Sequence, residues 1–451
     1  SLHDALPIYR AESLQFYANT EWISVIKSGY TIGLDGISLP LYFLSMVITV
    51  LVMIYSWDHI PSPGNPKAFL ILMLVLQTGM AGTFIAQDLI LFFVFFEIVL
   101  LPMYFMIGVW GGEQRQYASL KFFLYTMFGS ALMLVAFLAL FYKTGAESFS
   151  IPYLIQHGIN ISESTSIWIF AGMFIGFAVK VPMFPFHTWL PDAHTQAPTQ
   201  GSVILAAILL KLGTYGFVRI AIPILPQAAQ KWAPAIGILA VIGIIYGALG
   251  CLAQTDMKRL IAFSSVAHMG FVTLGFFIFN ELGVTGAIVQ MISHGFVSGA
   301  MFLSIGVLYD RVHSREIASY GGVANTMPRF AAFAVLFAMA NCGLPGTAGF
   351  VGEWMVILGA VKFNFWIAAL AATTLIFGAA YTLWMVKRVY FGDVANDDVR
   401  ELTDINAREF LMLALLAIAV LYMGIYPKPF TDVMDVSVNE LLRHVALSKL
   451  N

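Results

Sequence analysis

The chain has 451 residues, of which 59% are hydrophobic and only 11% are charged, and its formal net charge is −2. A soluble domain carries about 25% charged residues, so lipid must cover much of the surface of this chain. The basic residues are scattered between apolar runs without the clustered patch that phosphate binding requires, which excludes a nucleic-acid partner.

Twelve apolar stretches are long enough to cross a bilayer, whose core of about 30 Å requires about 20 apolar residues per helix. Short turns separate these stretches, and no segment shows the alternation of apolar and polar residues that is typical of a strand in an outer-membrane barrel. The sequence therefore predicts an all-α integral membrane protein, a polytopic helical bundle. The predicted spans are residues 36–57, 66–86, 88–110, 117–143, 166–190, 197–223, 233–254, 258–279, 284–309, 328–360, 365–391 and 406–427.

Basic residues are distributed unevenly over the loops between these spans. The loops after the first, third, fifth, seventh, ninth and eleventh spans, counted with the span ends beside them, hold 12 Lys and Arg residues, and the other internal loops hold 4. Basic loops stay in the cytoplasm. We therefore expect the first set of loops in the cytoplasm and the C-terminus outside.

The fifth and tenth spans are interrupted in the same way. The fifth contains Lys180-Val-Pro182-Met-Phe-Pro185, and the tenth contains Gly343-Leu-Pro345-Gly346. Proline removes a backbone hydrogen bond, so each helix should break inside the membrane. Each break lies in the fourth span of a five-span block, and five is odd, so the second block must insert upside down. This predicts two inverted five-helix repeats, each with a broken fourth helix, an arrangement found in many transporters.

These blocks divide the chain into four parts. We expect an N-terminal segment and first transmembrane helix at 1–65, a first inverted repeat at 66–223, a second at 224–391, and a C-terminal loop, last transmembrane helix and tail at 392–451.

Six ionisable residues lie well inside otherwise apolar spans. A charge at the centre of a membrane helix costs about 2.5–3.5 kcal/mol or more, so pairing, water or use in transport must offset that cost. Histidine suits proton relay because its ordinary pKa lies near neutrality. The candidate proton-transfer residues are Glu97, Lys180, Lys211, His268, His294 and Glu353.

Glu97 and Lys180 suggest a separable pair. Packed together, each would keep the other charged, and withdrawal of the carboxylate would release the proton of the lysine. The alternative is a static ion pair that fastens two helices. A lysine in the membrane interior beside a proline break favours the gate.

The other four candidates have alternatives of their own. Lys211 could extend to the surface if it lay near a helix end, but it lies about fifteen residues into its span. His268 and His294 suit a relay or a hydrogen-bonded polar core equally well. Glu353 follows the second break and is the counterpart of Lys180 there.

The segment His187-Thr-Trp-Leu-Pro-Asp192-Ala-His194 is only a weak signal for a metal-binding site, because no further ligand pattern supports it. We interpret Asp192 and His194 as a loop cap and His187 as a relay member. Cys251 and Cys342 stand apart in apolar stretches and fit no metal or cluster motif. With no glycine-rich phosphate loop either, we expect no nucleotide, flavin or metal in this chain.

A more specific signal begins at Lys180. The stretch KVPMFPFHTWLPDAHTQAPTQGSVILAAILLKLGTYG resembles the M subunit family (mitochondrial ND-four type) of the proton-pumping NADH:quinone oxidoreductase, respiratory complex I. Supporting segments are FFEIVLLPMYFMIGVWGG around Glu97, RLIAFSSVAHMGFV around His268, HGFVSGAMFLSIGVLYDR from His294 and GLPGTAGFVGEW around Glu353. The likeness extends from about residue 30 to 427. The HTQAPT motif and the glutamate at the second break favour the M type over the L and N types and over sodium/proton antiporter subunits.

The resemblance implies a proton-translocating membrane subunit with fourteen helices and two inverted repeats. It implies that Glu97 and Lys180 form the gating pair and that Lys211 is the central lysine. His268 and His294 would line the hydrated axis, and Glu353 would be the terminal site. NADH, flavin, iron–sulfur clusters and quinone are expected in partner subunits, among which L-type and N-type antiporter-like subunits would be neighbours in a bacterial inner (plasma) membrane.

Two features depart from the family pattern. Gln200 stands where a small residue is expected, and the chain offers twelve spans where the family has fourteen. Residues 1–12 match nothing expected of the family, so we expect an N-terminal fragment that lacks two helices upstream of Gly33.

Other functions remain open from the sequence. A sodium/proton antiporter subunit, or a subunit of a membrane-bound hydrogenase-type complex, would use the same fold, and a redox-inert scaffold would need none of the buried charges. A small-molecule carrier fits less well, since charges in single file suit protons better than a solute pocket.

Overall fold

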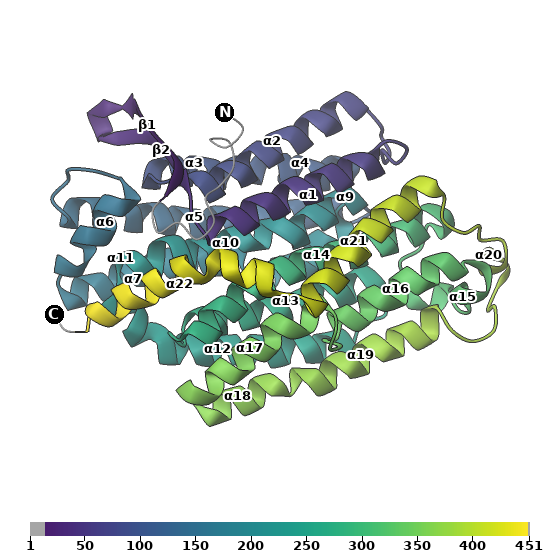
Figure 1. The fold of residues 1–451 in the computed structure, drawn as a ribbon. Helices are drawn as coiled ribbons and strands as arrows, with labels where there is room; N and C mark the ends of the chain where they lie inside the picture. Colours follow the sequence, from purple (N-terminus) through teal and green to yellow (C-terminus); the bar gives the residue numbers. More distant parts are fainter. Residues whose placement is uncertain (1–13, 450–451) are drawn as a thin grey trace.

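A computed structural model describes residues 14–449 as a bundle of helices that run side by side (Figure 1). Within that range, ten helices or joined helix runs are long and apolar enough to cross a membrane. They are α1 (Ser38–Ser56), α2 (Pro66–Ile85), α3 with α4 (Leu89–Ile98 and Leu100–Trp110), α5 (Arg115–Lys143), the run from α9 to α11 (Thr199–Ile224), α12 (Pro226–Leu252), α13 (Met257–Phe276), α14 (Glu281–Val312), α18 with α19 (Phe365–Ala372 and Thr374–Val389) and α21 (Ala407–Ile425).

The two remaining predicted spans are the interrupted ones. The fifth is α7 (Glu163–Lys180), a turn through Pro182 and Pro185, and α8 (Trp189–Gln196). The tenth is α16 (Pro328–Asn341), a turn, and α17 (Ala348–Phe363). Both breaks lie where the prolines and glycines predict them. Counted with these two, the described helices account for all twelve predicted spans.

The predicted helical fold class is confirmed, but two elements were not predicted. Strands β1 (Gln15–Ile23) and β2 (Ser28–Leu34) form an antiparallel hairpin before α1. Helix α22 (Lys428–Leu447) follows the last span, in the part of the chain expected to be a tail. It buries Met434, Val438, Leu441 and Val445, a spacing that turns one apolar stripe toward the bundle.

Shorter pieces complete the chain. They are α6 (Ile151–His157), α10 (Leu210–Gly216), α15 (Val323–Thr326), α20 (Asp397–Arg400), the 3-10 turns η2 (Ser24–Ile26), η3 (Gly158–Asn160) and η6 (Ile317–Ser319), and two π-helical turns, η4 (Leu205–Leu209) and η5 (Phe217–Ala221).

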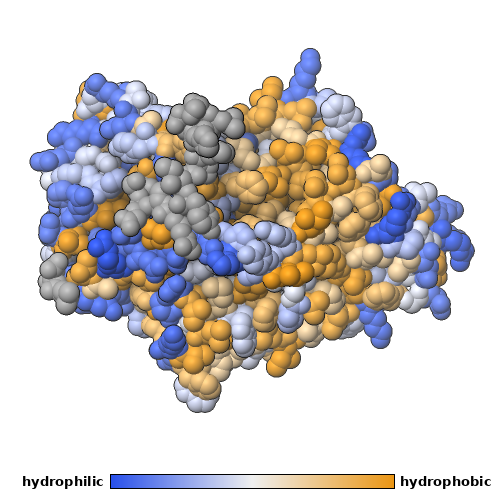
Figure 2. All heavy atoms as spheres, in the orientation of Figure 1, coloured by the Kyte–Doolittle hydropathy of each residue, from blue (hydrophilic) through white to orange (hydrophobic). Residues whose placement is uncertain are grey.

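The most deeply buried helices carry three of the six ionisable candidates, Lys211, His268 and His294. In α13 and in the run from α9 to α11, 94% of the most apolar window is buried, and in α14 all of it is buried. Figure 2 shows apolar residues over the middle of the bundle and hydrophilic residues at its left and right ends. The bundle therefore has a lipid-facing belt, two polar ends and a closed interior.

An ion pair joins the start of α1 to the run from α9 to α11. The guanidinium of Arg219 lies 2.6 Å from Asp35, whose carboxylate also accepts bonds from the backbone N–H groups of Ile37 and Ser38. Burial raises the pKa of Asp35, but Arg219 and these backbone donors outweigh it and hold the pKa below its ordinary value.

We expect Asp35→Asn to destabilise the solubilised chain by about 3 kcal/mol at neutral pH, because it leaves Arg219 largely buried without its counter-charge. A carboxyl with a lowered folded-state pKa stabilises the fold above its unfolded pKa of about 3.9, and that contribution disappears as pH falls through the folded-state value. Thermal unfolding followed by tryptophan fluorescence from pH 7 to pH 3 should show the stability difference between the two chains shrinking as the pH falls below the unfolded pKa. A difference of the same size at pH 7 and at pH 3 would contradict this explanation.

Candidate functional site

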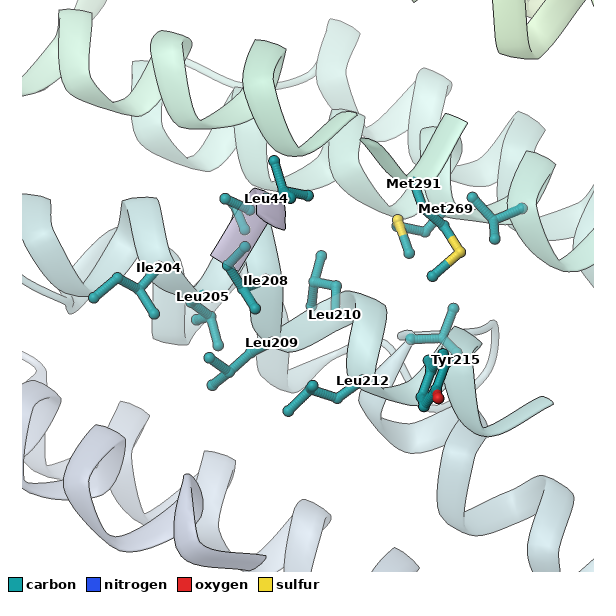
Figure 3. Close-up of a cluster of buried hydrophobic side chains, with 14 of the residues drawn as sticks. Leu44, Ile204, Leu205, Ile208, Leu209, Leu210, Leu212, Tyr215, Met269 and Met291 are labelled. Carbon is teal, nitrogen blue, oxygen red and sulfur yellow. The ribbon is translucent and has the colours of Figure 1, made fainter. Parts of the chain in front are cut away.

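Lys211 lies in a fully buried and irregular stretch of the run from α9 to α11. Its side chain is 0% exposed, and apolar residues including Leu205, Ile208 and Leu212 surround this part of the helix (Figure 3). The π-helical turns η4 and η5 flank α10, and such turns are frequent at functional sites. The ammonium Nζ donates to the carbonyl of Ala206 in η4, at 2.6 Å.

A chain of contacts leads from Lys211 across three helices. Lys211 Nζ lies 2.5 Å from His294 Nδ1, and the rings of His294 and His268 are 5.8 Å apart between centroids. His268 Nδ1 is bonded to Glu353, which also accepts a bond of 3.1 Å from Gln290. The structure thus brings together four of the predicted candidates, here called the axial row: Lys211, His294, His268 and Glu353.

A small cavity lies inside the axial row. It offers about 10 Å³ to the centre of a water molecule, between His268, His294 and Glu353, which is close to the minimum that one water needs. His268 Nε2 and the side-chain amide nitrogen of Asn341 are buried without a hydrogen-bond partner among the described residues. A water there would satisfy both.

Glycine at 352 determines how closely α17 approaches α14. A Cβ built at Gly352 would lie 2.7 Å from the backbone nitrogen of Gln290. Only glycine permits this approach, and the approach puts the neighbouring Glu353 within reach of His268 and Gln290.

We expect Gly352→Ala to separate the two helices at a cost of about 1–3 kcal/mol. Because it also draws Glu353 away from His268, transport through the axial row should fall at least about tenfold. Gly237→Ala is the matched control, since the nearest atom to its built Cβ is the side-chain Cδ1 of Ile367 at 3.7 Å. Melting temperature and redox-driven proton uptake of the reconstituted complex measure the two effects. Equal proton uptake by both variants would contradict the role given to Gly352.

Glu97 and Lys180 lie near each other without forming an ion pair among the described residues. Lys180 is 3% exposed, and its ammonium stands 4.3 Å from the centre of the Phe96 ring. Glu97 is half-buried, interacts with Ser130 and attracts Lys180 electrostatically. The two charges are therefore neighbours in this structure, with an aromatic ring beside the lysine.

The backbone around Lys180 packs closely against the helix that carries Lys211. A Cβ built at Gly213, two residues after Lys211, would lie 2.8 Å from the carbonyl oxygen of Phe177 and 3.1 Å from the Cβ of Lys180. The α7 break and α10 thus touch through a glycine.

The structure places His187 away from the axial row. Its ring packs against Phe184 and Tyr246, with centroids 5.6 Å and 4.9 Å away, and its buried Nδ1 lacks a hydrogen-bond partner in the described part of the chain. Its predicted part in a relay is therefore not supported by contact with the other candidates.

The interpretation of Asp192 and His194 as a loop cap is wrong. Both lie within α8, because the proline at 191 occupies the first turn of that helix, where its missing N–H does no harm. Asp192 pairs with Lys121 at 2.8 Å and with Arg259 at 3.0 Å, which fastens α8 to α5 and α13. His194 is fully buried.

Several polar residues of the site were missed in the sequence. Gln290 bonds to Glu353, and Ser265 Oγ lies 3.1 Å from His294 Nε2. Lys258, the first residue of a predicted span, is only 6% exposed. The sequence signal that could have identified these residues was a polar side chain within an otherwise apolar helix.

Gln200, which departs from the family pattern, is buried and donates a hydrogen bond to the backbone carbonyl of His59. Among residues 14–449, no group of three or more His, Cys, Asp or Glu could hold a metal ion.

Comparison with known proteins agrees with this geometry. The family model described as NADH:quinone oxidoreductase/Mrp antiporter, TM, matches residues 86–378, and the amino-terminal model of NADH-ubiquinone oxidoreductase chain 4 matches residues 9–83. NADH-quinone oxidoreductase subunit M of Rhodobacter capsulatus is 46% identical over 440 residues, 96% of this chain and 85% of that protein. NADH-ubiquinone oxidoreductase chain 4 of Arabidopsis thaliana is 44% identical over 95% of this chain and 86% of its own length.

Solved structures show the same fold. A chain of respiratory complex I from Thermus thermophilus with bound NADH superimposes with a TM-score of 0.88 at 30% identity, over 95% of this chain and 89% of that one. A chain of the Mrp complex from a Dietzia species shares the fold alone, with a TM-score of 0.83 at 20% identity. This chain therefore belongs to the NADH:quinone oxidoreductase/Mrp antiporter transmembrane family, and within it to the subunit M and chain 4 group of complex I membrane subunits.

Proposed function

We propose that this subunit moves protons across the membrane along Glu97, Lys180 and the axial row, driven by quinone reduction in other subunits of the complex. The observation that carries the proposal is the row of neighbouring groups from Lys211 to Glu353: hydrogen bonds join Lys211 to His294 and His268 to Glu353, and the two histidine rings stand 5.8 Å apart between centroids. Buried ionisable groups in membrane helices are costly and are associated with ion pathways.

The two parts of the site have different tasks. Lys180 and Glu97 act as the gate: approach of Glu97 keeps Lys180 charged, and its withdrawal releases a proton. The axial row then carries the proton, since each imidazole accepts a proton at one nitrogen and donates from the other. A water in the small cavity reaches the free Nε2 of His268 beside His294, and Glu353 is the carboxylate at the end of the row.

The wider setting is also part of the proposal. The subunit lies in the bacterial inner membrane beside L-type and N-type antiporter-like subunits, with its basic loops in the cytoplasm and its C-terminus outside. It contains no redox cofactor of its own. NADH, flavin, iron–sulfur clusters and quinone react elsewhere in the complex, and charge displacement there is transmitted to the row.

The test is Glu353→Gln in the complete complex, reconstituted in proteoliposomes. The amide keeps the size and one acceptor oxygen but cannot take up a proton, so redox-driven proton uptake should fall about tenfold or more. Glu281→Gln is the control, because Glu281 is exposed at the start of α14. Normal proton uptake by Glu353→Gln would overturn the proposal, and uptake that depends on a sodium gradient would favour the antiporter alternative.

A further inference from the structure

The loop at residues 57–65, which joins α1 to α2, forms one wall of a polar hollow. The hollow opens at the end of the bundle where α1 and α14 finish, the right end in Figure 1, and its volume is about 550 Å³. Residues 58–62 of the loop line it, and so do Tyr309 and Asp310 in the last turns of α14. The contacts that hold the loop against α14 therefore determine the shape of this hollow.

His59 attaches the loop to both helices. Its ring stacks on the ring of Tyr55, with centroids 4.6 Å apart, and its Nδ1 lies 3.0 Å from the backbone carbonyl oxygen of Tyr55. Its Nε2 lies 3.4 Å from the carboxylate of Asp310, which also accepts a hydrogen bond from the Tyr55 hydroxyl. These three residues, Tyr55, His59 and Asp310, are here called the latch.

Both ring nitrogens of His59 face oxygen atoms. A carbonyl oxygen and a carboxylate accept hydrogen bonds and donate none, and a neutral imidazole carries a proton on only one nitrogen. Either neutral form would turn a lone pair toward an oxygen, whereas the doubly protonated ring presents a proton to each. A neutral ring beside a protonated Asp310 would hold the same number of protons. The closed latch therefore contains one proton more than a separated neutral histidine and carboxylate.

A second tyrosine–histidine pair in the chain shows what the stacking does alone. His157 stacks on Tyr153, with centroids 4.0 Å apart, and its Nδ1 lies 2.8 Å from the carbonyl oxygen of Tyr153. No acidic side chain lies within ion-pair distance of His157 among residues 14–449. A histidine four residues after a tyrosine thus stacks without help from an acid, and Asp310 is the feature that makes the contact of His59 depend on protonation.

Arginine ion pairs surround the latch. Arg408 of α21 pairs with Asp58, the residue before His59, and Arg311 of α14 pairs with Glu409 of α21 at 2.8 Å. Arginine and exposed carboxylates stay charged from about pH 5.5 to pH 8.5. These two pairs therefore hold the loop and α14 to α21 at every pH in that range.

Three further cationic groups line the hollow: Lys258 of α13, and His313 and Arg315 after α14. Arg315 pairs with Asp256, and Lys258 donates to a backbone carbonyl of another segment at 2.6 Å, so these contacts lead away from the loop. His313 is exposed. His59 is therefore the group of the hollow whose protonation changes a contact between the loop and α14.

We propose that the latch is a pH-sensitive fastening, which holds the wall of the hollow against α14 at low pH and releases it at high pH. This inference does not depend on the proposed function. An imidazole loses its second proton near pH values of about 6.5. As the pH rises through that range, the Nε2–H bond of His59 breaks and the proton passes to water. A nitrogen lone pair then faces the Asp310 carboxylate, and the loop loses the attraction that held it to α14.

The test places a nitroxide spin label on the loop in the complete complex. Ser62→Cys provides the attachment point, because Ser62 is exposed and lines the hollow. The label is attached at one fixed pH, and the complex without this cysteine supplies the background spectrum. Between about pH 5.5 and pH 8.5, the ratio of mobile to immobile label should rise about threefold to fivefold, the effect of the loss of one partly exposed ion pair. A ratio that does not change with pH would overturn the proposal.

Variants in the same labelled complex separate the latch from other causes. His59→Gln should leave the label mobile at every pH, His59→Arg should leave it immobile because the positive charge is permanent, and Asp310→Asn should abolish the transition. His157→Gln and His313→Gln are the matched controls and should keep it. Subunit content shows that each variant assembles. A native transition in His59→Gln, or its loss in His313→Gln, would overturn the role given to His59.

Discussion

Lys180→Arg is expected to assemble normally and to lose most redox-driven proton uptake. Arginine keeps the positive charge, fits beside Phe96 and can reach Glu97, often with two parallel hydrogen bonds. If Lys180 only neutralises Glu97 or fastens two helices, its replacement by arginine should change proton uptake little. A gate must release its proton in each cycle, and arginine does not deprotonate in a protein.

The measurement combines subunit content with proton uptake in proteoliposomes. The membrane potential contributes about 2.3 kcal/mol per charge per 100 mV, and one pKa unit corresponds to about 1.4 kcal/mol, so modest changes around a lysine suffice for release. Lys231→Arg is the control, because Lys231 is exposed and pairs with Glu163 at the surface. Normal assembly with normal pumping would leave Lys180 as a structural charge and remove the gate.

Lys211→Met is expected to change stability and transport in opposite directions. Lys211 is fully buried and bonds only to a carbonyl and to His294 among the described residues, so its charge has no carboxylate to compensate it. Replacement of a buried charge by an apolar side chain of similar volume is often neutral or stabilising by about 1–4 kcal/mol. Proton uptake, however, should be almost lost, because the axial row then has no group at its start.

The melting temperature of the complex and proton uptake should be measured on the same preparation. Lys67→Met, an exposed lysine at the start of α2, controls for loss of one positive charge. A lower melting temperature with unchanged proton uptake would show that Lys211 is a structural residue and would contradict the account.

The sequence predicted the spans and breaks well because both depend on local chemistry. Apolar runs of helical length identify the spans, and Pro182 and Pro185 identify the break after Lys180. The β1–β2 hairpin and α22 were missed because neither contains an apolar run of membrane length. The stripe of Met434, Val438, Leu441 and Val445 in α22 carried a signal that a search for membrane spans does not use.

Six candidate positions were found because a charge in an apolar helix is rare, but their pairing could not be predicted. Which groups meet depends on helix rotation and on close approaches such as those at Gly213 and Gly352. Glu353 meets His268, and the ammonium of Lys180 stands over the ring of Phe96. The position of His194 was predicted wrongly because a proline and an aspartate near it are typical of a loop, although that proline lies in the first turn of a helix. The inverted repeats remain a prediction.

The most direct measurement of the central claim is infrared difference spectroscopy of the complete complex during NADH-driven turnover. If protons pass along the axial row, Glu353 must gain and lose a proton, and a carbonyl band of a protonated carboxyl should appear with turnover and shift in heavy water. The account requires this band to be absent in Glu353→Gln and displaced in His268→Gln, since His268 is the partner of Glu353. A turnover spectrum that is the same in the native complex and in Glu353→Gln would contradict the account.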